Sequence, residues 1–318
     1  MKILIADKFE ASGVEGLKKL GVEVFPEAGL KDAALTKRVA ELDPEILIVR
    51  STKVNAETLK AGKQLKIVIR AGSGYDTIDV KAASERGIKV TNCPGMNAIA
   101  VAELVMGHLL NLDRRIADNV SEARARRWNK KEFSKARGLK GSTLGIVGLG
   151  RIGTEVARRA LAFDMNVLWY DVIPNYNPLT HPNCKRTDLD TIFKEADYIT
   201  LHVPGSGDTK HLVNAARLAL MKKHAAIINT SRASVVDEPA LIAALKEGRL
   251  RAAAVDVFEG EPAADAKEVT SSLAELPNAY MTHHIGASTD QAQEAVAAET
   301  VRIVREYATA GKIINAVN

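Results

Sequence analysis

The sequence predicts an α/β protein built from two doubly wound parallel sheets, and three observations support this fold class. Short apolar runs alternate with stretches of helical periodicity, which is typical of strands joined by crossover helices. A glycine-rich turn at Gly148 begins a second such series. The length of 318 residues is more than one ordinary domain needs and suits two.

The composition indicates a folded protein without a membrane or metal component. It is 46% hydrophobic and 26% charged, with only 10 prolines. The two cysteines, Cys93 and Cys184, form no CxxC motif, so we expect neither a disulfide nor a metal site. No basic leader precedes the first apolar run and no apolar run reaches 18 residues, which predicts a cytoplasmic protein.

The net charge of +5 comes from 44 basic and 39 acidic residues. Much of the excess lies between residues 124 and 137, where a solvated helix and loop are the expected structure. No nucleic-acid-reading module accompanies these charges, so we expect no nucleic-acid partner. A modest positive field also suits a small anionic substrate or a dinucleotide.

The first series contains predicted strands at residues 3–6, 46–49, 67–69 and 88–90, with a helix at residues 12–20. Parallel sheets place their binding loops at the carboxyl ends of strands. The candidate binding residues at such ends are Arg50, Ser51, Arg70, Gly72 and Gly74.

The second series follows a long helix that begins near Asn97 and is expected to bridge the two domains. A final helical pattern, residues 290–307, has no strand after it, so we expect it to fold back over the first domain. The predicted strands between them are residues 144–147, 167–170, 198–201, 226–229, 253–257 and 280–282.

The strongest local motif is GLGRIG, residues 148–153, which follows a strand and opens a helix. Gly148 would allow a tight turn, Gly150 would let the backbone approach a pyrophosphate, and Gly153 would permit close packing of helix and strand. The helix amino terminus would donate N–H groups to phosphate oxygens. This context favours a dinucleotide site over a turn without a ligand.

Asp171 ends the next predicted strand, and no arginine or lysine comes directly after it. A carboxylate at this place can accept hydrogen bonds from ribose hydroxyls and would repel the extra phosphate of NADP. Such an aspartate is by itself more often a turn or helix cap. Together with GLGRIG it predicts NAD as the cofactor.

Arg232, Glu261 and His284 follow three successive strands of the second series. Singly, they could be an ion-pair partner, a solvated loop residue and a helix cap. Jointly they provide a cation for a carboxylate and a tuned imidazole for proton transfer near neutral pH. We therefore predict that these three are catalytic, in a hydride transfer involving a small 2-hydroxy or 2-oxo acid.

The chain resembles the D-isomer-specific 2-hydroxyacid dehydrogenase family over nearly its whole length, most closely the D-3-phosphoglycerate dehydrogenase branch. The segments that carry the resemblance are IVRSTKV (48–54), RAGSGYDTIDV (70–80), NAIAVAEL (97–104), LKGSTLGIVGLGRIG (139–153), SRASVVDE (231–238), DVFEGEP (256–262) and HIGAST (284–289).

The resemblance implies a flavodoxin-like substrate-binding domain, residues 1–96 plus 286–318, and a Rossmann NAD-binding domain, residues 97–285. Closure of one over the other would exclude water. It implies that Arg232 orients the substrate, His284 is the general acid/base, Glu261 favours the protonated imidazole, and Asp256 lies by the nicotinamide.

The implied contacts form two sets. Those to the cofactor are Gly148, Gly150, Arg151, Ile152, Gly153, Asp171, His202, Val203, Pro204, Thr230, Ser231, Arg232, Asp256, His284 and Gly286. Those to the substrate are Arg50, Ser51, Arg70, Gly72, Gly74, Asn97, Arg232 and His284.

The implied reaction interconverts 3-phosphoglycerate and 3-phosphohydroxypyruvate, a step of serine biosynthesis, and Arg50, Lys53 and Arg70 offer charge for a phosphate. The alternatives are a glyoxylate or hydroxypyruvate reductase of the same family and an NAD-binding corepressor-like protein. A homodimer is expected, with residues 97–127 as its surface.

Two departures from the family pattern affect loops and not the catalytic residues. Ala233 and Ser234 replace a usual pair of glycines, and His283 stands where a proline commonly precedes the catalytic histidine. They are expected to alter loop stiffness, and His283 adds a second imidazole.

Overall fold

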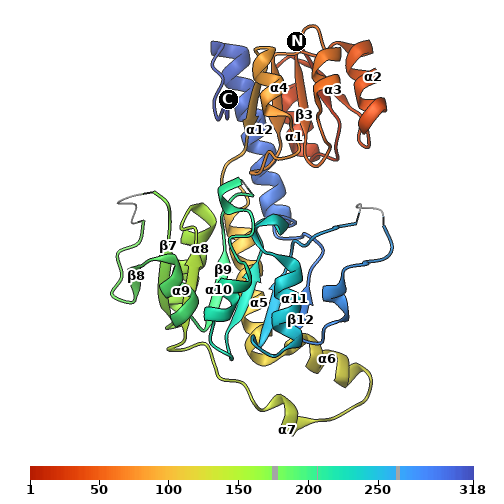
Figure 1. Ribbon diagram of the computed structural model, residues 1–318. Helices are drawn as coiled ribbons and strands as arrows, with labels where there is room; N and C mark the ends of the chain where they lie inside the picture. The colour runs from red at the N-terminus through yellow and green to blue at the C-terminus, as the bar shows by residue number, and fades with distance from the viewer. Residues whose placement is uncertain (174–177, 206, 263–265) are drawn as a thin grey trace. The chain divides into compact units, whose positions relative to one another are not determined.

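The computed structural model of the chain describes residues 1–173, 178–205, 207–262 and 266–318. These residues form two compact units, and both are visible in Figure 1. The first unit contains Met1–Asn97 and Ser288–Asn318, and the second is Ala98–Ala287. The boundaries expected from the sequence, after residues 96 and 285, lie one and two residues from these.

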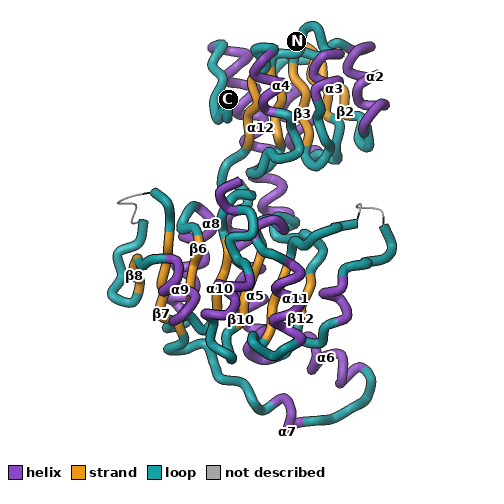
Figure 2. Tube along the Cα trace, viewed as in Figure 1, coloured by secondary structure: helices purple, strands orange, loops and turns teal. Residues whose placement is uncertain are grey.

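The first unit, all of which is described, has a five-stranded parallel sheet in the order β2-β1-β3-β4-β5 (Figure 2). This is the flavodoxin-like order, in which the winding reverses between β1 and β3. The strands are β1 (Lys2–Ile5), β2 (Glu23–Pro26), β3 (Ile46–Val49), β4 (Ile67–Arg70) and β5 (Lys89–Asn92). The helices are α1 (Ala11–Lys18), α2 (Asp32–Leu42), α3 (Ala56–Ala61), α4 (Val80–Glu85) and α12 (Asp290–Ala310).

Both faces of this sheet are covered, which explains why β3 is apolar at every position. Side chains alternate along β1, so that Leu4 belongs to one core while Ile3 and Ile5 belong to the other. The second of these cores is completed by α12, which packs against α1. The buried side chains that α12 contributes are Val296, Val301, Ile303 and Val304.

The described part of the second unit has a seven-stranded parallel sheet in the order β12-β11-β10-β9-β6-β7-β8. The winding reverses between β6 and β9, as in a Rossmann domain. The strands are β6 (Thr143–Val147), β7 (Asn166–Tyr170), β8 (Cys184–Arg186), β9 (Tyr198–Leu201), β10 (Ala226–Asn229), β11 (Ala252–Val255) and β12 (Ala279–Met281). The helices are α5 (Ala98–Arg114), α6 (Ile116–Arg124), α7 (Lys130–Phe133), α8 (Arg151–Ala162), α9 (Leu189–Glu195), α10 (Ala215–Leu220) and α11 (Glu238–Lys246).

The two sheets confirm the predicted fold class of two doubly wound parallel α/β domains. The sequence did not predict two of the strands, β2 and β8, and both lie at a sheet edge. An edge strand buries little of its length, so Cys184–Arg186 has no apolar run to mark it. The long helix expected from Asn97 onward ends at Arg114, because Arg115 takes a left-handed conformation with φ of 51°.

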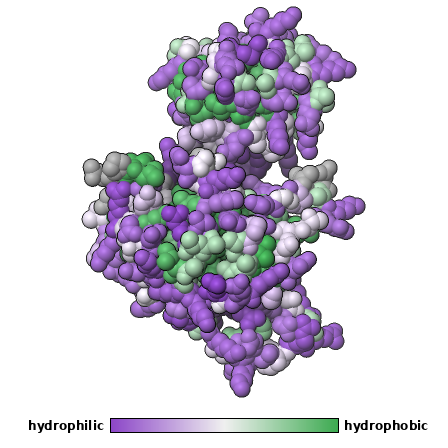
Figure 3. All heavy atoms as spheres, in the orientation of Figure 1, coloured by the Kyte–Doolittle hydropathy of each residue, from purple (hydrophilic) through white to green (hydrophobic). Residues whose placement is uncertain are grey.

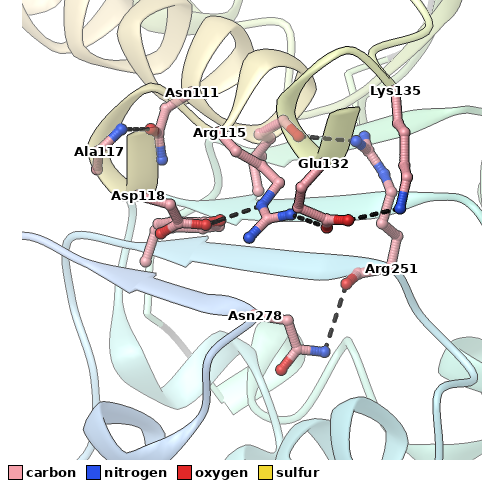
Figure 4. Close-up of polar contacts among 10 residues, drawn as sticks. Asn111, Arg115, Ala117, Asp118, Glu132, Lys135, Arg251 and Asn278 are labelled. Carbon is pink, nitrogen blue, oxygen red and sulfur yellow. Dashed lines mark hydrogen bonds and ion pairs between the residues drawn. The ribbon is translucent and has the colours of Figure 1, made fainter. Parts of the chain in front are cut away.

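Residues 115–138, which we name the α6–α7 arm, leave the sheet of the second unit after α5 (Figure 1). Arg115 fixes the start of this arm, as Figure 4 shows: Nε donates to Asp118 Oδ2 at 2.8 Å and Nη1 donates to Glu132 Oε1 at 2.7 Å. The hydroxyl of Tyr280 on β12 donates to the same Asp118 oxygen at 2.8 Å. These bonds tie both helices of the arm to the sheet.

Hydrophilic side chains predominate on the face seen in Figure 3, with apolar side chains in smaller patches. Within the described residues, no helix combines the length and apolar character needed to cross a membrane. The same residues contain no group of three or more histidine, cysteine, aspartate or glutamate side chains suited to a metal ion.

Candidate active site

The GLGRIG turn joins β6 to α8 and lies where the winding of the second sheet reverses. Gly148 has φ of 91°, and a Cβ there would come within 2.5 Å of the carbonyl oxygen of His202. A Cβ at Gly153 would overlap the carbonyl oxygen of Gly148. A Cβ at Gly150 would meet no described atom within 4 Å. The turn is therefore closely packed on its protein side and open at Gly150, which fits the approach of a pyrophosphate.

Asp171 follows β7 and braces this turn. Its Oδ2 accepts a hydrogen bond from Leu149 N at 2.8 Å, and its Oδ1 accepts one from Ile173 N at 3.0 Å. The carboxylate thus lies beside the glycine turn, where the sequence predicts the adenosine ribose. Arg186 of β8 donates to the carbonyl oxygens of Asp171 and Ile173 at 2.8 and 3.1 Å. Arg186 follows Asp171 by 15 residues, so no local motif could reveal this contact.

Two buried polar atoms at neighbouring strand ends lack a partner among the described residues. They are Nδ1 of His202, after β9, and the hydroxyl oxygen of Thr230, after β10. Burial lowers the pKa of His202 to about 3, so its ring is neutral, and its Nε2 lies 3.0 Å from Thr200 Oγ1. Val203 and Pro204 continue this segment. Unmatched polar atoms at the same edge of the sheet as the glycine turn fit a polar ligand such as a dinucleotide.

Arg232 lies at the end of a turn that Asn229 organises. The Asn229 side-chain oxygen accepts from Ser231 N at 3.0 Å and from Ser231 Oγ at 2.7 Å, and its amide donates to Arg232 O at 2.9 Å. The absence of a side chain at Gly205 leaves room for the Arg232 side chain, because a Cβ there would lie 2.9 Å from Arg232 Cγ. Asn229 and Gly205 were not predicted as site residues: Asn229 acts through a local turn to Ser231 and Arg232, and the tertiary contact with Arg232 reveals Gly205.

His284 and Glu261 form a short charge-assisted pair. His284 Nδ1 lies 2.7 Å from Glu261 Oε2, and the imidazole side chain is 55% exposed. The hydrogen bond to Glu261 raises the pKa of His284, although burial and the charge of Arg232 oppose the rise. Among the described residues, the pair leaves Nε2 of His284 available for proton exchange. His284 has φ of 52°, so its backbone is held in a left-handed turn.

Asp256 holds that turn in place. Its carboxylate is 1% exposed and accepts hydrogen bonds from Thr282 Oγ1 at 2.6 Å, Ile285 N at 2.9 Å and Gly286 N at 2.8 Å. These residues lie on both sides of His284. Asp256, predicted as a neighbour of the nicotinamide, thus braces the loop of the catalytic histidine, and its contact with the cofactor stays a prediction.

A cavity of about 220 Å³ adjoins the His284–Glu261 pair. Its walls include His283 and the apolar side chains of Phe258, Pro262 and Val269. The second imidazole therefore lies in the same recess as the predicted catalytic one.

The predicted substrate residues of the first unit lie at the carboxyl ends of its strands. Both the N–H and the hydroxyl of Ser51 donate to Asp7, at 3.2 and 3.1 Å. The Arg70 side chain packs over Gly72, where a Cβ would overlap its guanidinium. Asn97 Oδ1 accepts from Ser73 Oγ at 2.7 Å, which ties Asn97 to the loop of Gly72 and Gly74.

Residues 106–286 match the model of the NAD-binding domain of the D-isomer specific 2-hydroxyacid dehydrogenases. The chain belongs to this family. NAD is the cofactor of this dehydrogenase-family domain, and the glycine turn, Asp171 and Arg232 all lie within the matched residues.

Relatives of this 2-hydroxyacid dehydrogenase family member differ in substrate. A hydroxypyruvate reductase of Thermotoga maritima is 46% identical over 286 residues, 90% of each chain. A D-3-phosphoglycerate dehydrogenase of Methanocaldococcus jannaschii is 41% identical over 323 residues, covering 100% of this chain and 60% of that protein. The structure of D-lactate dehydrogenase from Aquifex aeolicus, complexed with NAD and lactic acid, matches with a TM-score of 0.83 and 30% identity over 99% and 98% of the chains. This chain thus spans nearly the full length of some relatives and about three fifths of others.

Proposed function

We propose that the protein is an NAD-dependent oxidoreductase that interconverts a D-2-hydroxy acid and its 2-oxo acid. The observation that carries this proposal is the 2.7 Å His284–Glu261 pair in the same unit as the dinucleotide turn. A histidine with a raised pKa can exchange a proton near neutral pH. Family membership supports the same reaction class.

Each side chain then has a distinct task. Bound NAD supplies the acceptor or donor of the hydride at C2. Neutral His284 takes the proton of the C2 hydroxyl during oxidation, and protonated His284 returns it to the carbonyl oxygen during reduction. Glu261 stabilises the imidazolium, and Arg232 orients the carboxylate and carbonyl of the substrate.

For the substrate, we propose 3-phosphoglycerate and 3-phosphohydroxypyruvate. The relative from Methanocaldococcus jannaschii and the positive charge of Arg50, Lys53 and Arg70 support this choice. A charge-assisted contact to phosphate contributes about 1.5–3 kcal/mol, enough to distinguish phosphorylated from unphosphorylated acids. Arg70 lies over Gly72, so Arg50 is the stronger candidate.

Hydroxypyruvate or glyoxylate is the second candidate, favoured by the higher identity and nearly complete coverage of the Thermotoga maritima reductase. An assay of NADH oxidation with 3-phosphohydroxypyruvate, hydroxypyruvate and glyoxylate separates the two candidates. We expect kcat/KM to be highest for the phosphorylated acid, and Arg50→Ala to reduce that value by about 10-fold or more while affecting the other acids less. Equal losses would refute phosphate recognition by Arg50. Absence of turnover with every acid would favour a corepressor-like role.

We also propose a homodimer whose contact surface includes residues 97–127. Neither α6 nor α7 has a buried residue, and Ile116, Val120 and Trp128 are 47%, 43% and 87% exposed. Apolar side chains on an arm of this kind are typical of a protein interface. Light scattering over a range of concentrations is expected to give the dimer mass, and Val120→Asp is expected to lower it. A monomer at every concentration would refute the proposal.

A further inference from the structure

The carboxylate of Asp7 accepts five hydrogen bonds from three consecutive residues that follow β3. Oδ2 accepts from the backbone N–H groups of Arg50, Ser51 and Thr52 at 2.6, 3.2 and 3.1 Å. Oδ1 accepts from the hydroxyls of Ser51 and Thr52 at 3.1 and 3.0 Å. One side chain therefore braces all three residues of this loop.

Asp7 lies just after β1, and the loop lies just after β3, the neighbouring strand in the sheet. The winding of the first sheet reverses between these two strands. In open α/β sheets, ligands bind in the crevice at the carboxyl ends of strands where the winding reverses. The Asp7 contacts thus bridge the position at which the first unit is expected to bind a ligand.

The charge state of Asp7 suits this arrangement. Burial opposes ionisation, but the hydrogen bonds from Arg50, Thr52 and Ser51 outweigh it and lower the pKa of the carboxyl. Consecutive backbone N–H groups that converge on one point form a site for an anion, and here the protein's own carboxylate occupies it. These N–H groups are therefore already bonded, and the Arg50 guanidinium is a cation that this loop could offer to a substrate anion.

We propose that Asp7 is a positioning residue for substrate binding, which fixes the loop of Arg50, Ser51 and Thr52 so that Arg50 meets the anionic substrate. This inference rests on the proposed substrate role of Arg50. It also gives Ser51 a different task from the predicted one: Ser51 secures the loop to Asp7.

The experiment compares Asp7→Asn with a matched control, Asp43→Asn. Asp43 Oδ1 also accepts two backbone N–H bonds in the first unit, from Lys63 and Gln64 at 2.7 and 2.9 Å, but before the start of β4. Both changes retain a side-chain oxygen and remove the charge, so a general loss of stability should affect both. Thr52→Val, which removes one hydrogen bond to Asp7 and the longer bond of the same hydroxyl to Leu30 O, provides a milder test if Asp7→Asn does not fold.

We expect Asp7→Asn to raise KM for the oxo acid about 10-fold, the effect of ~1.4 kcal/mol, with little change in kcat or in the Kd of NADH. Asp43→Asn is expected to leave KM unchanged. In the Arg50→Ala background, Asp7→Asn should add less than 2-fold, because both changes remove the same contact. Independent effects in the double variant, or equal KM changes for Asp7→Asn and Asp43→Asn, would overturn the inference. If Arg50→Ala alone left KM unchanged, the proposed role of Arg50 would fail instead.

Discussion

The three glycines of the dinucleotide turn differ in what surrounds them, and this permits a prediction with two separable readouts. Gly153→Ala would place a methyl group against the carbonyl oxygen of Gly148 and 3.3 Å from Ile146 Cγ2. A backbone atom cannot move aside as a flexible side chain can, so we expect an overpacking cost of about 1–3 kcal/mol. For a domain of this size, each kcal/mol lowers Tm by roughly 2–4 °C. Gly153→Ala should therefore lower Tm by roughly 2–12 °C without cofactor.

Gly150→Ala should have the opposite pair of effects: no loss of thermal stability, but weaker binding of NADH. Its φ of −64° suits alanine and no described atom lies within 4 Å of the added Cβ, so Tm should stay the same or rise slightly. The methyl group would occupy the space predicted for the pyrophosphate, and losing one charge-assisted hydrogen bond costs about 1.5–3 kcal/mol. The Kd of NADH should then rise by roughly 10- to 150-fold.

Fluorescence titration with NADH and thermal unfolding without cofactor measure the two effects. Gly107→Ala in α5 is the control, since a Cβ there also meets open space but lies outside the turn, and it should leave the Kd of NADH unchanged. Wild-type NADH affinity in Gly150→Ala would refute the predicted cofactor position. Wild-type Tm in Gly153→Ala would refute the close packing of the turn.

Three further predictions concern the chemistry. Glu261→Gln removes the partner that raises the pKa of His284. The pH above which reductive activity falls and the pH below which oxidative activity falls should therefore both decrease. Unchanged pH profiles in both directions would contradict this. His284→Asn should slow turnover by about 10²–10⁴, while His283→Asn should keep it, and the reverse result would transfer proton exchange to His283. Asp171→Ala should weaken the preference for NAD over NADP, measured as the ratio of the two kcat/KM values. An unchanged ratio would mean that another residue selects the cofactor.

Much of the fold could be predicted because buried parallel strands have simple sequence patterns. Continuous apolar runs mark β3 and β11, whose residues are all buried. The edge strand Glu23–Pro26 has no fully buried residue and ends in proline, so its sequence is indistinguishable from a loop. The end of α5 was equally hidden, since a left-handed arginine has no sequence signature.

The candidate site likewise contains residues that could be predicted from the sequence and residues that could not. GLGRIG could be predicted as a dinucleotide turn because its six residues are consecutive, and Asp171 because it comes directly after the next strand. Asp7 could not, because 43 residues separate it from Arg50 and only the pairing of β1 with β3 brings them together. Arg186 is a similar case, because it acts through backbone groups 13 and 15 residues away that become neighbours only after folding.

The position of α12 in the first unit affects the order in which a ribosome can produce a folded protein. About 190 residues of the second unit are synthesised between the first sheet and the helix that completes its core. At roughly 5–20 residues per second, this interval lasts about 10–40 s. During that time Ile3 and Ile5 lack the α12 side chains that cover them in the finished protein. The second unit, whose sequence is continuous, can complete its core first, and the nascent first sheet is the segment that would engage a chaperone.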